Sequence, residues 1–349
     1  MPELTTQFDA ALSNIEPTDD DKDNAPRAHA EVSDALVADP VIAGWGFEPL
    51  LIGSYKRHVS IRRIKDVDVF GRLTTLPDDV LPSTVLAEFE RVLLAAFPTV
   101  DGKKRVERQA RSLQVSFEEY DGLYVDAVPA RPWTAPDGTE AWQLPKREDG
   151  DDPDGWQATN PDELTRLTSE LNDADHFDEF YVPTVKLLRQ TRRSLLGKRK
   201  PGGLTVEIAA LHAFRSGKVT GPTHADYYAT ALRETGNVLY NAFVLSEGID
   251  DPTLPGEQIL VRGSEEDKTA LANEFLAAAD RAEEALASTD KCAAAKTFRE
   301  LLGTAVDDIG DTDYVFPMPD TCNADGTAKR FTTVTAGDSH VPAGDRRFG

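Results

Sequence analysis

The sequence has few of the features that tie a protein to a membrane or to a disulfide scaffold. No run of about 18 apolar residues occurs among its 349 residues, so no membrane span and no membrane partner are expected. The N-terminus lacks the basic and then apolar stretches of a secretory signal. Cys292 and Cys322 are the only cysteines, too few for a disulfide framework or a cysteine-ligated zinc site. We therefore expect a cytoplasmic protein in a reducing environment.

Several common catalytic motifs are also absent. The chain contains no Gly-x-x-x-x-Gly-Lys-Ser/Thr phosphate loop, no His-Glu-x-x-His zinc motif and no Gly-x-Ser-x-Gly nucleophile elbow. Its six histidines are scattered along the sequence. These absences argue against the hydrolase and nucleotide-binding classes that such motifs define.

Positive charge is scarce and concentrated. The formal net charge of −23 argues against an extended nucleic-acid surface, because phosphate backbones would be repelled. Residues 55–65 and 186–200 are two basic islands without a single acid. One such cluster is usually a solvated face, but two in so acidic a chain favour a confined anionic ligand.

The most informative pattern joins a Gly53-Ser54 turn to Asp66-x-Asp68 through eleven residues. On a strand, alternate side chains leave the same face, so Asp66 and Asp68 point together. Two carboxylates on one face repel each other unless a cation lies between them, and Mg²⁺ prefers carboxylate oxygens. Solvated acids are the alternative, since Asp173 and Asp175 show the same spacing in polar sequence. Only the first pair is embedded in β-branched and aromatic residues.

Asp126 is the candidate for a third carboxylate. It interrupts an otherwise apolar strand at residues 123–128, and a buried aspartate needs a partner. A surface-edge position for Asp126 remains open, as do Glu118 and Glu119 as rival ligands. Three carboxylates on adjacent strands could hold two Mg²⁺ ions, or Mn²⁺ in their place.

The same pattern predicts groups that bind a nucleoside triphosphate. Gly53 lets the backbone approach phosphates closely, and the Ser54 hydroxyl can donate to them. Lys56 lies in the basic loop that follows. In the second island, Lys186 and Arg189 share one helical face, from which Lys186 is expected either to reach the triphosphate or to extend to solvent.

Strand patterns dominate the first half of the chain and helical patterns the second, which predicts an α+β fold with two lobes and a central cleft. We expect a catalytic core at residues 1–160, a helical lobe at 161–318 and a flexible, exposed tail at 319–349. Residues 134–162 resemble a loop. The expected elements are helices at residues 4–15, about 18–38 and 82–97; strands at 46–53, 66–73, 105–109, 113–117 and 123–128; and helices at 162–174, 176–196, 204–217, 225–247, 264–288 and 291–308.

Together, Gly53-Ser54, Asp66-x-Asp68 and Asp126 resemble the motif of the DNA polymerase β-like nucleotidyltransferase superfamily. The chain is similar, over roughly residues 5–310, to the cGAS/DncV-like nucleotidyltransferases of anti-phage (CBASS) signalling. The segments that suggest this branch are Val125–Ala130, Trp156–Pro161, Phe180–Leu187 and Gly203–Glu207.

The resemblance implies an enzyme that joins nucleoside triphosphates into a cyclic di- or trinucleotide sensed by an effector, with release of pyrophosphate. It implies that Asp66 and Asp68 hold both Mg²⁺ ions and that Asp126 completes the acceptor-side metal site. Ser54 and Lys186 would contact the donor triphosphate.

One further expectation follows from the resemblance, and two alternatives to the cyclic product remain open. A chain that ends in Gly349 resembles members whose terminal carboxylate is conjugated by a ubiquitin-transfer-like enzyme. The alternatives to a cyclic product are transfer of a nucleotide to RNA, a protein or a small molecule, and a catalytically silent nucleotide-binding protein.

Overall fold

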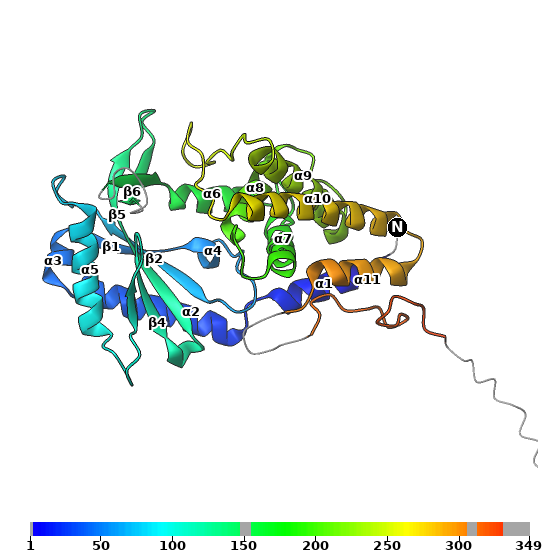
Figure 1. The fold of residues 1–349 in the computed structure, drawn as a ribbon, viewed down its shortest axis with the longest axis horizontal. Helices are drawn as coiled ribbons and strands as arrows, with labels where there is room; N and C mark the ends of the chain where they lie inside the picture. The colour runs from blue at the N-terminus through cyan, green and yellow to red at the C-terminus, as the bar shows by residue number, and fades with distance from the viewer. Residues whose placement is uncertain (1–2, 147–154, 306–312, 331–349) are drawn as a thin grey trace, which may run out of the picture.

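The computed structural model describes residues 3–146, 155–305 and 313–330. A sheet with its covering helices forms one side of the molecule, and a bundle of helices forms the other (Figure 1). The two-lobed α+β architecture predicted from the sequence is therefore confirmed. The short helix α4 (Gly53–Lys56) lies between the two parts.

The sheet is built around one parallel pair of strands. Its order is β1-β2-β5-β4-β3, in which β2 and β5 run parallel and the other neighbours antiparallel. Val67 and Val69 are buried against the helices, so alternate positions of β2 leave the opposite face, as predicted. The strands are β1 (Phe47–Ile52), β2 (Asp66–Leu73), β3 (Val106–Arg108), β4 (Leu113–Phe117) and β5 (Leu123–Thr134).

Three helices complete this lobe on the apolar face of the sheet. They are α2 (Asp19–Val37), α3 (Pro40–Gly44) and α5 (Pro82–Ala96). Thr18 begins α2 with a capping box, in which its hydroxyl accepts from Asp21 N–H and the Asp21 carboxylate accepts from Thr18 N–H. The face left uncovered by these helices carries the carboxylates.

The prediction of a loop at 134–162 is wrong. β5 continues to Thr134 and pairs with β6 (Glu140–Pro145), which pairs with β7 (Trp156–Thr159). Aromatic side chains of β6 and β7 contact residues that are distant in sequence. The Trp142 ring meets the Phe70 ring edge-on with centres 5.9 Å apart, and the Arg131 guanidinium lies 4.6 Å from the centre of a Trp156 ring. Turn-forming residues dominate this stretch of sequence, so periodicity alone did not reveal the short strands.

The helical lobe has its own apolar core. Its helices confirm the predicted series, although α7 begins five residues later than expected and α11 ends before the expected boundary. They are α6 (Pro161–Leu171), α7 (Tyr181–Leu196), α8 (Gly203–Arg215), α9 (His224–Phe243), α10 (Glu265–Ala287) and α11 (Lys291–Leu302).

The first helix, α1 (Thr5–Ile15), packs into the helical lobe. Phe8 is fully buried and meets Phe298 and Phe316 edge-on, at ring-centre distances of 5.0 and 5.1 Å. This packing differs from the prediction, which groups α1 with the sheet. An amphipathic pattern shows that a helix needs a partner surface but does not say which surface.

The segment after α11 is also packed, which corrects the expectation that an exposed tail begins at residue 319. Cys322 is 3% exposed and forms a disulfide with Cys292 of α11. Just before it, Val315 and Phe316 are fully buried. Gly349 and the other residues after 330 lie outside the described part of the chain. Among the described residues, no helix is both long and apolar enough to cross a membrane.

Breaking the Cys292–Cys322 bond should lower the free energy of unfolding, because the bond closes a loop spanning 30 positions. The chain-entropy estimate for a loop of that size is roughly 3–4 kcal/mol. We expect the urea midpoint of the wild-type protein to fall when dithiothreitol is added. Cys322→Ser lacks the bond, so its midpoint should match that of reduced wild type and should not change with reductant. Equal midpoints for oxidised and reduced wild type would contradict the expectation.

Candidate active site

Strand pairing brings the three predicted aspartates to one end and one face of the sheet. Asp68 on β2 lies beside Asp126 on β5 in the parallel register, and Asp66 lies beside Tyr124. Because Asp66 and Asp68 are two residues apart, they share the face that Asp126 occupies on the neighbouring strand. The edge position considered for Asp126 is excluded, since β5 has β2 on one side and β4 on the other.

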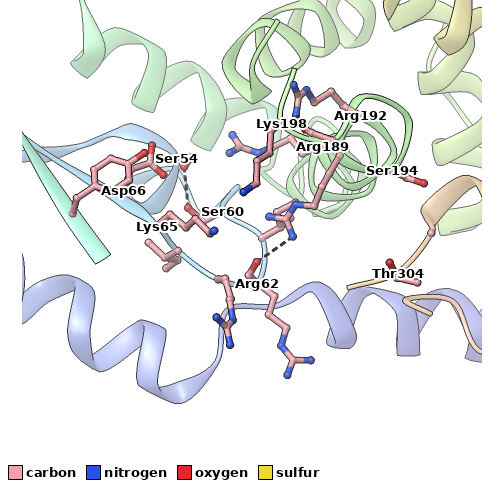
Figure 2. A pocket seen from close by; sticks show the side chains of 17 residues that line it. Ser54, Ser60, Arg62, Lys65, Asp66, Arg189, Arg192, Ser194, Lys198 and Thr304 are labelled. Atoms are coloured by element: carbon pink, nitrogen blue, oxygen red, sulfur yellow. Dashed lines mark hydrogen bonds between the residues drawn. The ribbon is translucent and has the colours of Figure 1, made fainter. Parts of the chain in front are cut away.

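The Gly53-Ser54 turn lies directly against this carboxylate group. Gly53 has φ +82°, and a Cβ at this position would overlap the Asp68 carboxylate. The Ser54 and Ser60 hydroxyl oxygens are 2.9 Å apart in a hydrogen bond, which closes the loop after α4 (Figure 2). Only glycine at position 53 therefore allows the turn and the aspartate to approach so closely.

Burial and mutual repulsion make negative charge costly here. Desolvation, followed by the charges of Asp66 and Asp126, raises the pKa of Asp68 to about 7, against the opposing effect of Arg57. Desolvation and Asp66 likewise raise the pKa of Asp126 to about 6, and Asp126 Oδ1 is buried without a hydrogen-bond partner. An oxygen-preferring divalent cation would relieve both effects, so these residues fit such an ion.

The carboxylates are not gathered into a finished cation site. Within the described ranges, no three His, Cys, Asp or Glu side chains are grouped closely enough to hold a metal ion. Asp66 is exposed and lines a cavity of about 810 Å³, whereas Asp68 and Asp126 line a second cavity of about 630 Å³. The rival ligands Glu118 and Glu119 form ion pairs with Lys103 and Arg105 and line neither cavity.

The first cavity brings the two basic islands together (Figure 2). Arg189 lines it, together with Ser54 and Asp66 from the sheet side. Arg193 Nη1 donates to the Arg62 carbonyl at 3.2 Å and so joins the two islands directly. The basic residues of this cavity are Arg62, Arg63, Lys65, Arg189, Arg192, Arg193 and Lys198. Its positive lining suits a polyphosphate.

Two predicted nucleotide-binding residues lie elsewhere. Lys186 is buried on α7, where its ammonium group donates to the Glu16 carboxylate, and Lys56 is exposed at the end of α4. Neither lines either of the two cavities. Nearby basic residues are placed differently. Arg189, three positions after Lys186, lines the first cavity. Arg57, which follows Lys56, is buried and its guanidinium donates to the Glu207 carboxylate.

The second cavity contains groups that sequence patterns did not reveal. Gln157, Leu204 and Arg262 line it, although they lie far from the aspartates in sequence. The segments that contain the first two were noted only through the family resemblance. Nothing in the local sequence of Arg262 indicated a place in this site.

Comparisons with known proteins identify a domain of the chain and its relatives. Residues 3–172 match the model of the Second Messenger Oligonucleotide or Dinucleotide Synthetase domain. The cyclic AMP-AMP-AMP synthase of Acinetobacter sp. (strain ATCC 27244 / 9458) is 25% identical over 316 residues, covering 86% of this chain and 85% of that protein.

Two solved structures share the fold. Escherichia coli MS115-1 CdnC with ATP has a TM-score of 0.62 at 18% identity, over 85% of this chain and 97% of that one. The DncV cyclic AMP-GMP synthase of Vibrio cholerae, a prokaryotic cGAS homologue, has a TM-score of 0.62 at 12% identity, over 86% and 94%.

The fold and the aspartate site define a nucleotidyltransferase. Residues 3–172 carry the second-messenger synthetase domain, and the chain as a whole is similar to the cGAS/DncV-like nucleotidyltransferases that its sequence resembles.

The raised pKa of Asp68 predicts how the folding stability depends on pH when a metal chelator keeps divalent ions away from the site. With a pKa of about 7 when folded and about 4 when unfolded, Asp68 binds more protons in the folded state between those values, so stability falls as pH rises. We expect Asp68→Asn to raise Tm by a few degrees at about pH 8 and to lose that gain at about pH 4. Thermal unfolding over this range, with exposed Asp173→Asn as control, measures the effect. An equal gain at both ends would contradict it.

Proposed function

We propose that this protein joins nucleoside triphosphates into a cyclic di- or trinucleotide second messenger and releases pyrophosphate. The observation that carries the proposal is the parallel register of Asp68 and Asp126 beside the Gly53-Ser54 turn and the basic cavity. The family of the chain and its synthase relatives support the same activity. Its setting would be anti-phage defence, with an effector that senses the product.

The aspartates have the main chemical roles in this proposal. Asp66, Asp68 and Asp126 would hold Mg²⁺, which when bound neutralises phosphate charge and lowers the pKa of an attacking hydroxyl. Two ions are the number proposed, with Mn²⁺ as a substitute. Asp126 would complete the acceptor-side metal site and help to deprotonate the ribose hydroxyl.

The first cavity is the proposed site of the donor triphosphate. The Ser54 hydroxyl would donate to phosphate oxygens from the sheet side, and Arg189 from the helical side. Gly53, the other residue of the turn, lines the second cavity. Lys186 and Lys56 are weaker candidates, because one is paired with Glu16 and the other lies outside the cavity. Arginine also suits phosphate better, since its planar group donates two hydrogen bonds at once.

We place the enzyme in the cytoplasm, where nucleoside triphosphates are made. The Cys292–Cys322 bond would then have to persist in the presence of cellular thiols.

Transfer of a single nucleotide to RNA, a protein or a small molecule would use the same site, and a silent nucleotide-binding protein would show binding alone. Product analysis separates the three.

Wild-type protein incubated with all four labelled nucleoside triphosphates and Mg²⁺ should give a phosphatase-resistant product and pyrophosphate. Asp66→Ala/Asp68→Ala should reduce the rate at least about 1,000-fold, because both carboxylates of β2 are lost from the site. Asp173→Ala/Asp175→Ala has the same spacing at exposed positions and should keep the wild-type rate. Chromatography with mass spectrometry identifies the product. A linear product, or unchanged turnover in the first variant, would refute the proposal.

We also propose that the C-terminal carboxylate of Gly349 is conjugated by a ubiquitin-transfer-like enzyme. Glycine has no Cβ and fits the narrow channels of adenylating and thioester-forming enzymes. The residue lies outside the described part of the chain, so the proposal rests on the sequence and the family. The structure of E. coli MS115-1 CdnC with HORMA-deltaN is a complex of that relative with a different kind of partner.

Deleting Gly349 should abolish higher-mass conjugates of the protein when it is expressed with the partner enzyme, while turnover with nucleoside triphosphates stays at the wild-type level. Immunoblotting detects the adducts, and a catalytically inactive partner enzyme provides the background. Adducts that persist unchanged in the deletion variant would exclude Gly349 as the attachment point.

A further inference from the structure

A buried carboxylate links the two lobes behind the proposed triphosphate site. The Glu207 side chain, on α8, is 0% exposed, and that of Arg57 is 5% exposed. Arg57 follows the Gly53-Ser54 turn and binds Glu207 through two hydrogen bonds, Nε to Oε1 at 2.5 Å and Nη2 to Oε2 at 3.1 Å. This bidentate pair fastens the end of α4 in the sheet lobe to a helix of the other lobe.

The same carboxylate also holds an arginine of the first cavity. Arg189 Nη1 donates to Glu207 Oε2 at 3.3 Å, which is longer than either contact from Arg57. Arg189 Nε is buried and has no hydrogen-bond partner. Arg189 is thus held weakly by protein, keeps an unused donor, and lines the cavity proposed for phosphate.

Charge and space at this cluster fit an incoming anion. Two guanidinium groups share one carboxylate, so the buried cluster of Arg57, Glu207 and Arg189 carries a net positive charge. Asp68 favours the charged form of Arg57 and Asp66 that of Arg189, and a phosphate in the first cavity would add negative charge beside Arg189. Gly203 contributes room, because a Cβ there would lie 3.0 Å from Arg189 Cζ.

We infer that Glu207 is a positioning residue for nucleotidyl transfer. It fixes Arg57 behind the turn that binds phosphate and aims Arg189 into the first cavity, so one carboxylate aligns the phosphate-binding groups of both lobes. The inference deepens the proposed function and rests on it. Arg57 also stabilises the negative charge of Asp68, which connects the cluster to the aspartates.

A purely structural role for Glu207 makes a different prediction. Breaking a buried pair by removing one partner is destabilising in any case, so loss of activity in Glu207→Gln alone would not separate the two roles. Replacing both partners of a buried pair with apolar residues of similar size often preserves stability. The double variant Arg57→Met/Glu207→Met keeps the buried volume of the pair but also removes the carboxylate that Arg189 contacts, so its unfolding midpoint has to be measured beside its activity.

We expect the double variant to unfold within a few degrees of wild type, yet to bind a non-hydrolysable ATP analogue about 10-fold more weakly and to lose roughly 10- to 100-fold in kcat/KM. Wild-type binding and turnover in this variant would overturn the inference. Glu300→Gln, which breaks an exposed pair with Arg281 between α10 and α11, is the matched control and should leave both values unchanged.

Arg189→Gln keeps the inference testable if the double variant does not fold, because it leaves the Arg57–Glu207 pair intact. It should keep the wild-type unfolding midpoint while binding the analogue about 10-fold more weakly, and unchanged binding would overturn the inference. Pyrophosphate release by wild type is measured first. If wild type turns over no nucleoside triphosphate, the proposed function fails, whereas analogue binding by the variants still decides the role of Glu207.

Discussion

Repulsion among three carboxylates at one end of the sheet is the constraint that organises this molecule. The parallel pairing of β2 and β5 places Asp68 beside Asp126, with Asp66 two residues away. Desolvation of Asp68 and Asp126 weakens the screening of their charges by water, so positive groups nearby stabilise them. Although the net charge of the chain is −23, both of its acid-free basic segments line the first cavity, and Arg57 and Arg262 lie near Asp68 and Asp126.

The parts of the site that follow from local rules could be predicted from the sequence. Alternation along β2 placed Asp66 and Asp68 on one face, because side-chain direction on a strand has a period of two. Asp126 was identified because it interrupts an otherwise apolar strand, where a buried aspartate needs a partner. Gly53 was singled out because glycine lets the backbone approach a phosphate closely, whereas the close approach in the structure is to the Asp68 carboxylate.

The rest depended on contacts between distant segments. Lys56 and Arg57 are adjacent in sequence, and only Glu207, 150 positions away, determines that Arg57 is the buried one. Likewise Lys186 forms an ion pair with Glu16, which is distant in sequence, whereas Arg189 lines the first cavity. The same limit explains α1 and the β6–β7 strands, whose partners are chosen by tertiary packing.

The two cavities separate opposite chemical demands along a single strand. A departing pyrophosphate needs positive charge, which the first cavity provides through its arginines and lysines. An attacking hydroxyl needs a base, and the second cavity holds the half-buried carboxylate of Asp126, proposed to help deprotonate it. Asp66 and Asp68 lie on opposite sides of this division yet only two residues apart. Both carboxylates would hold Mg²⁺, and a rigid strand fixes their spacing more closely than a loop would.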